Sequence, residues 1–357
     1  MSNTLGTLFK LTTFGESHGD LMGGVIDGFP AGFNLDLKKV QEKINLRKPG
    51  RSNLVSSRKE SDIVEFKSGI LKNKTLGTPI GFIIKNKDYK NKDYSLIKDL
   101  YRPSHADFTY EKKYGIMDPY GGGRSSARET VCRVVAGALA SQFLSKKGVS
   151  VFSYVSSVGS VQLKKFYQDL DFSKIYKNEI FCPDDLCASE MKKKIEEVKK
   201  IGDTIGGCVS TVVTGLPIGL GQPIYNKLNA AISYAMMSIN AAKGIEFGSG
   251  FNAAKMLGSD HNDVFIKKGN RISTKSNNSG GIQGGISNGQ DILFRIVFKP
   301  VSSIMNRQKT INKDQQEVVF MNKGRHDPCV VSRAVPIVES MASIVLMDMY
   351  LLNLSSK

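Results

Sequence analysis

The sequence predicts an α+β fold, because its expected strands occur in runs that a few helices separate, without regular strand–helix alternation. Two strand-rich stretches, residues 5–30 and 62–86, flank one helical pattern at residues 35–47. The chain has 357 residues, 40% of them hydrophobic, which is enough for one large core or two ordinary ones. Since no low-complexity linker or internal repeat divides it, we expect a single domain over residues 1–357.

Helices are expected where apolar residues recur at a spacing of three or four. Residues 35–47 show this pattern and stop before Pro49. Residues 125–147 show it more strongly, and Gly148 ends them. The other expected elements are strands at residues 149–162, 208–220 and 292–298, and helices at residues 184–201 and 226–242.

The last apolar stretch, residues 334–354, is long enough to cross a membrane. Pro336, Glu339 and Asp348 interrupt it, and a membrane span would tolerate these residues poorly. We therefore expect a buried helix and no membrane partner. The N-terminus shows no basic segment followed by an apolar run, so a secretory signal is not expected either.

The net charge of +17 raises the question of a nucleic-acid partner. Lysines supply most of it, in runs that lack the interleaved aromatic residues of a nucleic-acid-binding face. Arginines gather at residues 47–58, 102–133 and 295–333, beside segments rich in glycine and histidine. Because a guanidinium binds phosphate or carboxylate groups through paired hydrogen bonds, these clusters favour a small anionic ligand and no nucleic acid. A basic nucleic-acid-binding protein with incidental glycine loops is the competing hypothesis.

The cysteines give no sign of a disulfide framework or a metal site. The five cysteines form no CxxC pair and no zinc spacing, and the chain has only four histidines. Their number is odd and the chain is not small, so free thiols in a reducing compartment are expected. No metal site is predicted.

The sequence GESHG places His18 between glycines at the end of an expected strand. A histidine on such a turn can reach a ligand and exchange a proton near neutral pH. The segment lacks the G-x-S-x-G pattern of many hydrolases, and the adjacency of Ser17 and His18 does not place a nucleophile beside its base. Taken alone, the segment is more typical of a structural turn than of a catalytic one.

The sequence YGGGRSSARET leads into the helix expected at residues 125–147. Its glycines allow the backbone to approach a ligand closely. Arg124, Ser125 and Arg128 surround the first turn, where free N–H groups and the helix dipole favour an anion. The Walker A ending is missing. An ordinary capped helix is the alternative, and the density of glycine, serine and arginine favours the anion site.

Three further segments contain residues suited to a ligand. The sequence RPSHAD holds His105, which with Asp107 could form an ordinary hydrogen-bonded pair. The glycine-rich residues 277–289 match no dinucleotide fingerprint and fit a flat ligand or a plain turn equally well. The sequence RHDPC holds Asp327, which could act as a base, cap the helix that follows, or do both.

Together these segments resemble the signatures of the chorismate synthase family. The three longest are GESHG continued to Pro30, GRSSARET continued to Leu139, and RHDPC continued to Met341. Four shorter segments fit in the same order, at residues 102–107, 202–207, 238–250 and 278–289. Several long motifs in the correct order are far more specific than any one of them, and they span nearly the whole chain.

The resemblance implies a β-α-β sandwich, in which helices pack between antiparallel sheets. It implies a cytoplasmic homotetramer that serves the shikimate pathway and aromatic amino acid biosynthesis. The reaction would be the 1,4-anti elimination of phosphate from 5-enolpyruvylshikimate 3-phosphate, which gives chorismate with no net redox change. Reduced FMN (FMNH2) would be the cofactor, with NADPH as a candidate reductant of the flavin.

By position, the resemblance also implies roles for individual residues. His18 would protonate the departing phosphate, His105 would face the anionic flavin, and Asp327 would be the base that relays a proton. The residues implied to bind the substrate's phosphate and carboxylates are Arg47, Arg58 and Arg128. The residues implied to hold FMN are Arg124, Ser125, Ser126, Asn240, Ala241, Gly284, Lys299, Pro300, Val301, Ser302, Ser303 and Arg325.

One position departs from the family pattern. Leu46 stands where a basic residue is usual in the loop that reaches Pro49, which weakens the expectation of an NADPH contact there. A flavoprotein oxidoreductase without lyase activity is the alternative of a different class, and in it His18 and Asp327 need not matter.

Overall fold

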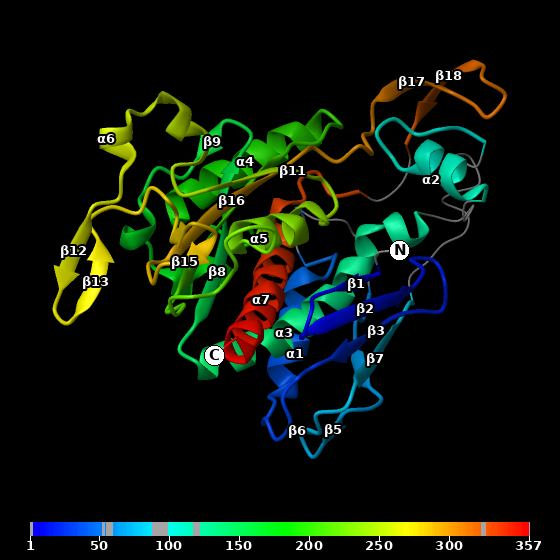
Figure 1. The fold of residues 1–357 in the computed structure, drawn as a ribbon. Coiled ribbons are helices and arrows are strands. Elements are labelled where there is room, and N and C mark those ends of the chain that lie inside the picture. Colours follow the sequence, from blue (N-terminus) through cyan, green and yellow to red (C-terminus); the bar gives the residue numbers. More distant parts are fainter. Residues whose placement is uncertain are drawn as a thin grey trace.

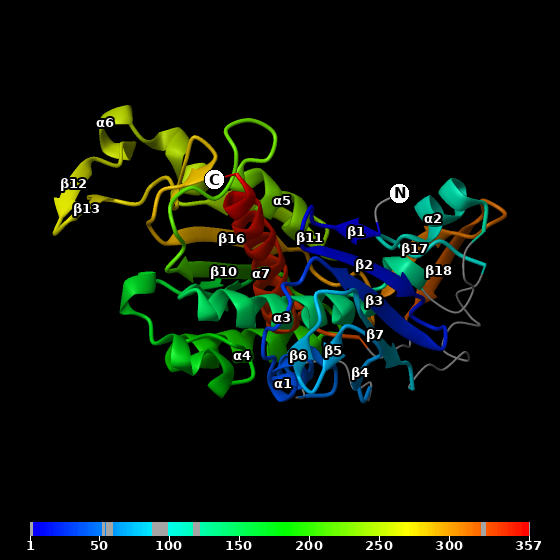
Figure 2. The same cartoon turned by 60° about the horizontal axis from the view of Figure 1, so that its bottom comes forward.

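The structure, a computed structural model, describes residues 3–51, 54, 60–87, 99–116, 122–322 and 326–356. Two five-stranded sheets enclose a central layer of helices (Figure 1 and Figure 2). Both sheets are antiparallel throughout. The α+β class and the sandwich of helices between antiparallel sheets are thereby confirmed.

The first sheet has the strand order β1-β2-β3-β7-β4. Alternate side chains, such as Leu11, Ile26 and Ile80, are buried towards the helices, as expected for a sheet with one covered face. The tight turn predicted at Gly15 lies between its second and third strands. Its strands are β1 (Thr4–Leu5), β2 (Lys10–Gly15), β3 (Leu21–Asp27), β4 (Val64–Phe66) and β7 (Ile80–Lys85), and the hairpin β5 (Ile70–Leu71) and β6 (Lys74–Thr75) precedes β7.

The second sheet has the strand order β11-β16-β10-β8-β9. The strand expected at residues 292–298 is present over those residues. The strand expected at residues 208–220 stops at Thr214, because Gly215 takes a φ of 75° and turns the chain. The strands are β8 (Ser150–Val158), β9 (Val161–Gln162), β10 (Gly207–Thr214), β11 (Ala242–Phe247) and β16 (Ile292–Phe298).

Three helices form the central layer: α1 (Leu37–Arg47), α3 (Thr130–Lys146) and α7 (Val331–Ser355). By length and composition α7 could cross a membrane, but 83% of its most apolar window is buried inside the protein. It is therefore the core helix that the sequence predicted. Helix α3 starts later than expected, because residues 123–129 form two short 3-10 turns instead.

The two longest central helices approach each other most closely at Gly137. A Cβ atom on Gly137 would lie 2.4 Å from Cα and 2.3 Å from Cβ of Ser340 in α7. Only a glycine therefore permits this spacing of α3 and α7. Elsewhere, the Asp348 carboxylate on α7 accepts backbone N–H groups of Thr7, Leu8 and Phe9 at 2.7–2.9 Å, which fixes the N-terminal strands to the same helix.

The remaining elements lie around the sandwich. The helix expected at residues 226–242 ends early, at Met237, and the chain turns at Ala241, with a left-handed φ of 67°, before it continues as β11. The sequence did not predict α2 or the hairpin of β17 and β18. The peripheral elements are α2 (Asp107–Tyr114), α4 (Asp185–Lys200), α5 (Leu228–Met237), α6 (Gly258–His261), and the hairpins β12 (Phe265–Lys268) with β13 (Arg271–Thr274), β14 (Ile282–Gln283) with β15 (Ile286–Ser287), and β17 (Arg307–Ile311) with β18 (Glu317–Met321).

We expect Gly137→Ala to destabilise the protein. Alanine favours a helix by about 1 kcal/mol over glycine, but the new methyl group would overlap the backbone of Ser340, and overpacking costs about 1–3 kcal/mol. Urea unfolding followed by circular dichroism measures the difference. Gly258→Ala in α6 is the matched control, because no atom lies within 4 Å of its added Cβ. A Gly137→Ala protein as stable as the wild type would contradict this account of the core.

Candidate active site

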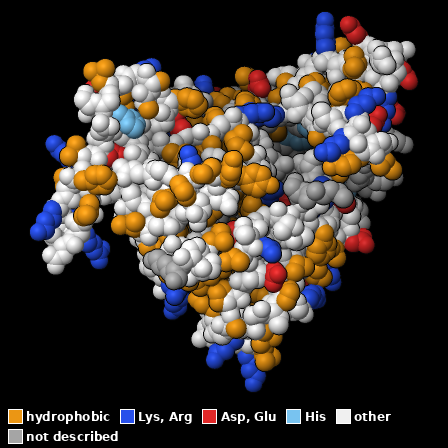
Figure 3. All heavy atoms as spheres, viewed as in Figure 1, with side chains coloured by type: hydrophobic (Ala, Val, Ile, Leu, Met, Phe, Trp, Pro, Cys, Tyr) orange, Lys and Arg blue, Asp and Glu red, His pale blue; other side chains and the backbone are white. Residues whose placement is uncertain are grey.

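A cavity of about 470 Å³ lies where the start of α3 meets the loops that follow α5, follow β16 and precede α7. Figure 3 shows this face of the molecule hollowed, with basic side chains and a histidine in the hollow. Most of the predicted site residues line the cavity. They are Arg47, His105, Ser125, Ser126, Arg128, Asn240, Ala241, Lys299, Pro300, Val301, Ser302, Ser303 and Asp327.

Three predicted residues that the structure describes, His18, Arg124 and Gly284, do not line this cavity. Arg124 points away from it and donates to the carbonyl of Gly15 at 3.2 Å and to Thr13 Oγ1 at 2.7 Å. Gly284 lies in the turn between β14 and β15, with a φ of 59°. Arg58 and Arg325 lie outside the described residues. The roles expected for all of the predicted site residues stay predictions.

His18 is half-buried on the loop between β2 and β3, where its Nδ1 lies 2.9 Å from Ser17 Oγ. The amide of Asn86 donates to the carbonyls of Glu16 at 3.0 Å and Gly19 at 2.7 Å on this loop. The amide oxygen of Asn86 accepts from Arg128 Nε at 3.0 Å, and Arg128 lines the cavity. The loop that carries His18 is therefore hydrogen bonded, through Asn86, to the wall of the site.

A buried carboxylate joins two of the predicted arginines. Asp62 is fully buried and accepts from Arg47 Nη1 at 3.0 Å and, on its other oxygen, from Arg128 Nη1. Arg47 is also buried and donates to Thr130 Oγ1 and to the carbonyl of Ala127. Burial lowers the pKa of Arg47 to about 10, with Asp62 opposing that shift, so the guanidinium stays charged at neutral pH.

The guanidinium of Arg128 has one donor atom that makes no hydrogen bond among the described residues. Its side chain is 9% exposed, and its Nη2 atom has no hydrogen-bond acceptor within the part of the chain that the structure describes. A carboxylate oxygen of Glu60 forms an ion pair with this atom at 3.7 Å, which is beyond hydrogen-bond length. Because a buried donor without an acceptor is costly, this atom is suited to an anion that enters the cavity.

His105 is held between two neighbours. Its Nδ1 lies 3.0 Å from the carbonyl of Pro103, and its Nε2 lies 3.0 Å from Ser303 Oγ. A carbonyl can only accept, so Nδ1 carries the proton. Burial first, and then the charge of Arg102, lower the pKa of His105, which favours a neutral ring whose Nε2 accepts from Ser303.

Two non-glycine residues at the cavity have left-handed backbones, Ser104 with φ 58° and Ala241 with φ 67°. Such strain persists only where the surroundings hold it, and it is common at functional sites. Ser302 Oγ donates to the carbonyl of Ser104 at 3.2 Å. Next to it, Arg102 binds both oxygens of Asp107 at 2.7 and 2.6 Å, and these bonds lower the carboxyl pKa although burial raises it.

Asp327 faces the cavity from the loop before α7. Arg333 Nη1 donates to its carboxylate at 2.6 Å, while Arg333 Nε donates to the carbonyl of Arg47 at 3.2 Å. Farther along this wall, Thr204 Oγ1 donates to the carbonyl of Val301 at 2.7 Å, and the N–H of Ile205 donates to the carbonyl of Pro328 at 2.9 Å. Arg333 and residues 204–205 therefore fix the loops that carry predicted site residues.

Sequence reasoning missed three residues that organise the site: Asp62, Glu60 and Asn86. Each lies in a polar stretch without a recognisable motif, and each acts through contacts with residues far along the chain. The one available signal was indirect. Clustered arginines that are to be buried need carboxylate partners, but the sequence does not show which carboxylates these are.

Comparison with known proteins agrees with the geometry. A family model described as chorismate synthase matches residues 9–351. The chain belongs to the chorismate synthase family. A chorismate synthase of Christiangramia forsetii is 60% identical over 99% of this chain and 99% of its own length, and one of Flavobacterium psychrophilum is 56% identical over 98% of each. A crystal structure of a chorismate synthase superposes with a TM-score of 0.78 at 30% identity, covering 97% of this chain and 93% of that one.

Membership of the chorismate synthase family makes the chain a lyase of the shikimate pathway, in aromatic biosynthesis, that acts on a small-molecule substrate. The family also implies a reduced flavin as cofactor. Both ligands are anionic, which accounts for the arginine clusters better than a nucleic-acid partner does.

We expect the His105 ring to be neutral at pH 7, with its proton on Nδ1 and a pKa below the ordinary value of about 6.5. The unfolded chain takes up this proton near pH 6.5, whereas the folded protein resists it. The contribution of His105 should therefore lower the free energy of unfolding as the pH falls from about 6.5 towards the folded pKa.

Nitrogen-15 NMR of the labelled imidazoles measures tautomer and pKa directly, with His105→Gln to assign the signal. Three other histidines in the same spectra serve as internal references. A His105 ring with its proton on Nε2, or one that titrates above 6.5, would show that this description of the hydrogen bonds is incorrect.

Proposed function

We propose that the chain converts 5-enolpyruvylshikimate 3-phosphate to chorismate by 1,4-anti elimination of phosphate, with reduced FMN (FMNH2) as cofactor. The observation that carries the proposal is the buried Nη2 of Arg128, which lies 3.7 Å from Glu60 and makes no hydrogen bond among the described residues, in a cavity lined by several cations. The substrate has one phosphate and two carboxylates, and FMN adds a second phosphate. The cationic lining residues are Arg47, Arg102, Arg128, Lys299 and Arg333.

The residues present suit a flavin phosphate on one side of the cavity. Lys299 Nζ donates to the hydroxyl of Ser302, and burial, followed by the charge of Lys243, lowers the pKa of Lys299. Ser126 and Asn240 add polar groups from the start of α3 and the loop after α5. We infer that FMN is held by this set, together with the predicted Arg124, Gly284 and Arg325.

The substrate's phosphate fits the other side, at Arg128. Fixed positive charge there would stabilise the oxygens of the leaving group. His18, on the loop that Asn86 joins to Arg128, would donate the proton to the departing phosphate. Arg47 would act with Arg58 and Arg128 in binding the substrate's anionic groups.

Asp327 is the proposed base. Its bond to Arg333 orients the carboxylate towards the cavity and keeps it from swinging away. His105 would hydrogen bond to the flavin through Nε2, in exchange for its contact with Ser303 Oγ, while Nδ1 keeps its bond to Pro103. When bound, reduced flavin supplies the electron-rich partner that lets the elimination proceed without net oxidation.

We also propose the wider setting of the enzyme. We infer one domain over residues 1–357, a cytoplasmic location, and NADPH as a candidate source of electrons for the flavin. A homotetramer is supported by exposed apolar side chains on the projecting arm of residues 249–275, which a second copy of the chain would cover. The most exposed of them are Phe251, Leu257, Phe265 and Ile272.

Anaerobic turnover tests the proposed reaction. The protein is mixed with 5-enolpyruvylshikimate 3-phosphate and chemically reduced FMN, and the release of phosphate and chorismate is followed. We expect one phosphate for each chorismate and no net oxidation of flavin. Folded protein that binds reduced FMN but releases no phosphate would favour the flavoprotein oxidoreductase instead.

We expect His18→Ala to lower turnover by roughly 10²–10⁴-fold, the usual contribution of a positioned proton donor. The affinity for FMN should change little, because His18 does not line the cavity. His261→Ala is the matched control, since that histidine lies in α6 and bonds to Ser249 away from the cavity. Turnover of His18→Ala equal to that of the control would remove the proposed role of His18.

A further inference from the structure

The loop of residues 238–241, between α5 and β11, reaches the cavity with its last three residues. Asn240 Nδ2 donates to the carbonyl of Ser125 at 2.8 Å, and the N–H of Lys299 donates to the carbonyl of Ala241 at 3.0 Å. Ala241 has a φ of 67°, a conformation that is unfavourable for a residue with a Cβ atom. Some further interaction must therefore hold the loop in this shape.

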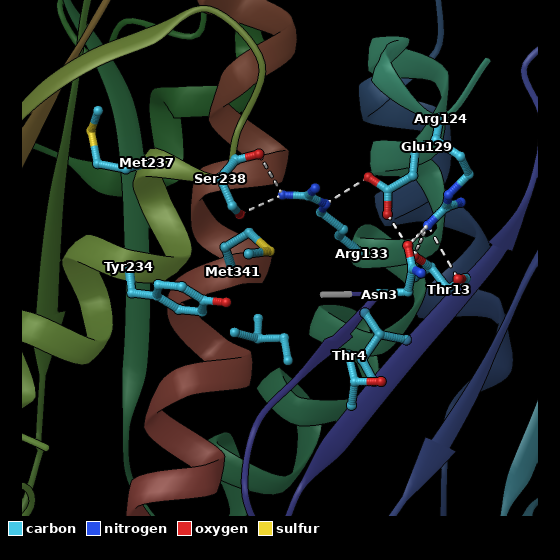
Figure 4. Close-up of a pocket in the computed structure, with 12 residues that line it drawn as sticks. Asn3, Thr4, Thr13, Arg124, Glu129, Arg133, Tyr234, Met237, Ser238 and Met341 are labelled. Carbon is cyan, nitrogen blue, oxygen red and sulfur yellow. Dashed lines mark hydrogen bonds and ion pairs between the residues drawn. The ribbon is translucent and has the colours of Figure 1, made fainter. Parts of the chain in front are cut away.

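That interaction comes from the side of the loop that faces away from the cavity. Arg133 Nη1, on α3, donates to Ser238 Oγ at 2.7 Å and to the carbonyl of Ser238 at 3.1 Å (Figure 4). Ser238 is the residue that ends α5. A cation bonded to the final carbonyls of a helix is favourable both as a hydrogen-bond donor and through the helix dipole.

Arg133 is itself held in one orientation. Its Nε donates to Glu129 Oε2 at 2.7 Å, and Glu129 is buried. Glu129 Oε1 accepts from Thr13 Oγ1 at 2.9 Å, and Thr13 Oγ1 accepts from Arg124 Nη2 at 2.7 Å. In Figure 4 these side chains form a continuous chain from β2 across the start of α3 to the loop after α5.

This chain of side chains lines a second cavity of about 460 Å³. Neither Arg133 nor Glu129 is among the residues that line the first cavity. Arg133 therefore acts on the first cavity indirectly, through its bonds to Ser238 on the loop, while Glu129 and Thr13 join it on the other side to Arg124.

We propose that Arg133 is a positioning residue, which Glu129 orients and which holds residues 238–241 in the shape that presents Asn240 and Ala241 to the cofactor. The role in cofactor binding rests on the proposed function. The role in holding the loop does not, because it concerns contacts within the ligand-free protein.

Hydrogen exchange and flavin titration together test this role. In wild-type protein without ligand, the amides of Ser238, Ile239, Ala242 and Lys299 are hydrogen bonded and should be protected. In Arg133→Met their exchange should accelerate by about tenfold or more, and the Kd for FMN should rise by roughly tenfold, the value of a charged hydrogen bond. At saturating reduced FMN, kcat should stay within about threefold of the wild type.

A second substitution, Ala241→Gly, tests whether backbone strain at Ala241 contributes to the loss of FMN affinity. Glycine adopts a positive φ without penalty, so adding Ala241→Gly to Arg133→Met should restore part of the lost FMN affinity. Arg133→Lys, which keeps the charge but reaches fewer acceptors, should fall between Arg133→Met and the wild type. If Arg133→Met does not fold, Glu129→Gln provides the same test, since it keeps the bond to Thr13 and removes the charge that orients Arg133.

Arg271→Met, an exposed arginine on β13, is the matched control and should change none of these readouts. Wild-type exchange rates and wild-type FMN affinity in Arg133→Met would overturn the proposal. Faster exchange in a protein whose wild type binds no FMN would support the positioning role and contradict the proposed cofactor instead.

Discussion

The site depends on one buried carboxylate, Asp62, shared by two arginines. Arg47 ends α1 and Arg128 precedes α3, so the carboxylate joins two elements that would otherwise present like charges to each other. Removing one partner from a buried ion pair typically costs about 3–5 kcal/mol, because the remaining charge is left without compensation. Asp62 thereby allows a dense group of guanidiniums to exist in the protein interior.

The ion pairs of Asp62 also position other charged residues of the cavity. Arg47 is anchored, and its carbonyl fixes Arg333, which in turn holds Asp327. Arg128 is anchored through one Nη atom and through Asn86, while its other Nη atom lies 3.7 Å from Glu60 and makes no hydrogen bond among the described residues, so a ligand could bind it. An enzyme for anionic substrates needs positive charge that is in place before the ligand binds. These contacts hold the arginine side chains in position in the ligand-free protein.

The sequence predicted what depends on local pattern. The strand at residues 292–298, the core helix α7 and the glycine-flanked turn before β3 follow from spacing, hydropathy and turn residues, and all are present. The motifs also brought His105, Arg128, Ala241 and Asp327 into one hypothesis before any geometry was available, and all four line one cavity. The length and order of the family motifs made it possible to group these residues from the sequence.

What the sequence could not predict depends on contacts between distant residues. No local pattern shows that Asp62 would be buried between two arginines, or that Arg124 would turn away to bond with Thr13. The start of α3 was misplaced because residues 123–129 satisfy their backbone groups in 3-10 turns, which apolar spacing does not reveal. The left-handed backbone of Ala241 likewise arises from tertiary contacts and not from its own preference.

A crystal structure of the protein with FMN and 5-enolpyruvylshikimate 3-phosphate tests the central claim most directly. The account predicts a substrate oxygen within hydrogen-bond distance of Arg128 Nη2, and the flavin against the wall formed by Ser126, Asn240 and Ser302. An FMN bound in the second cavity beside Arg133, or a substrate held without any contact to Arg128, would contradict it.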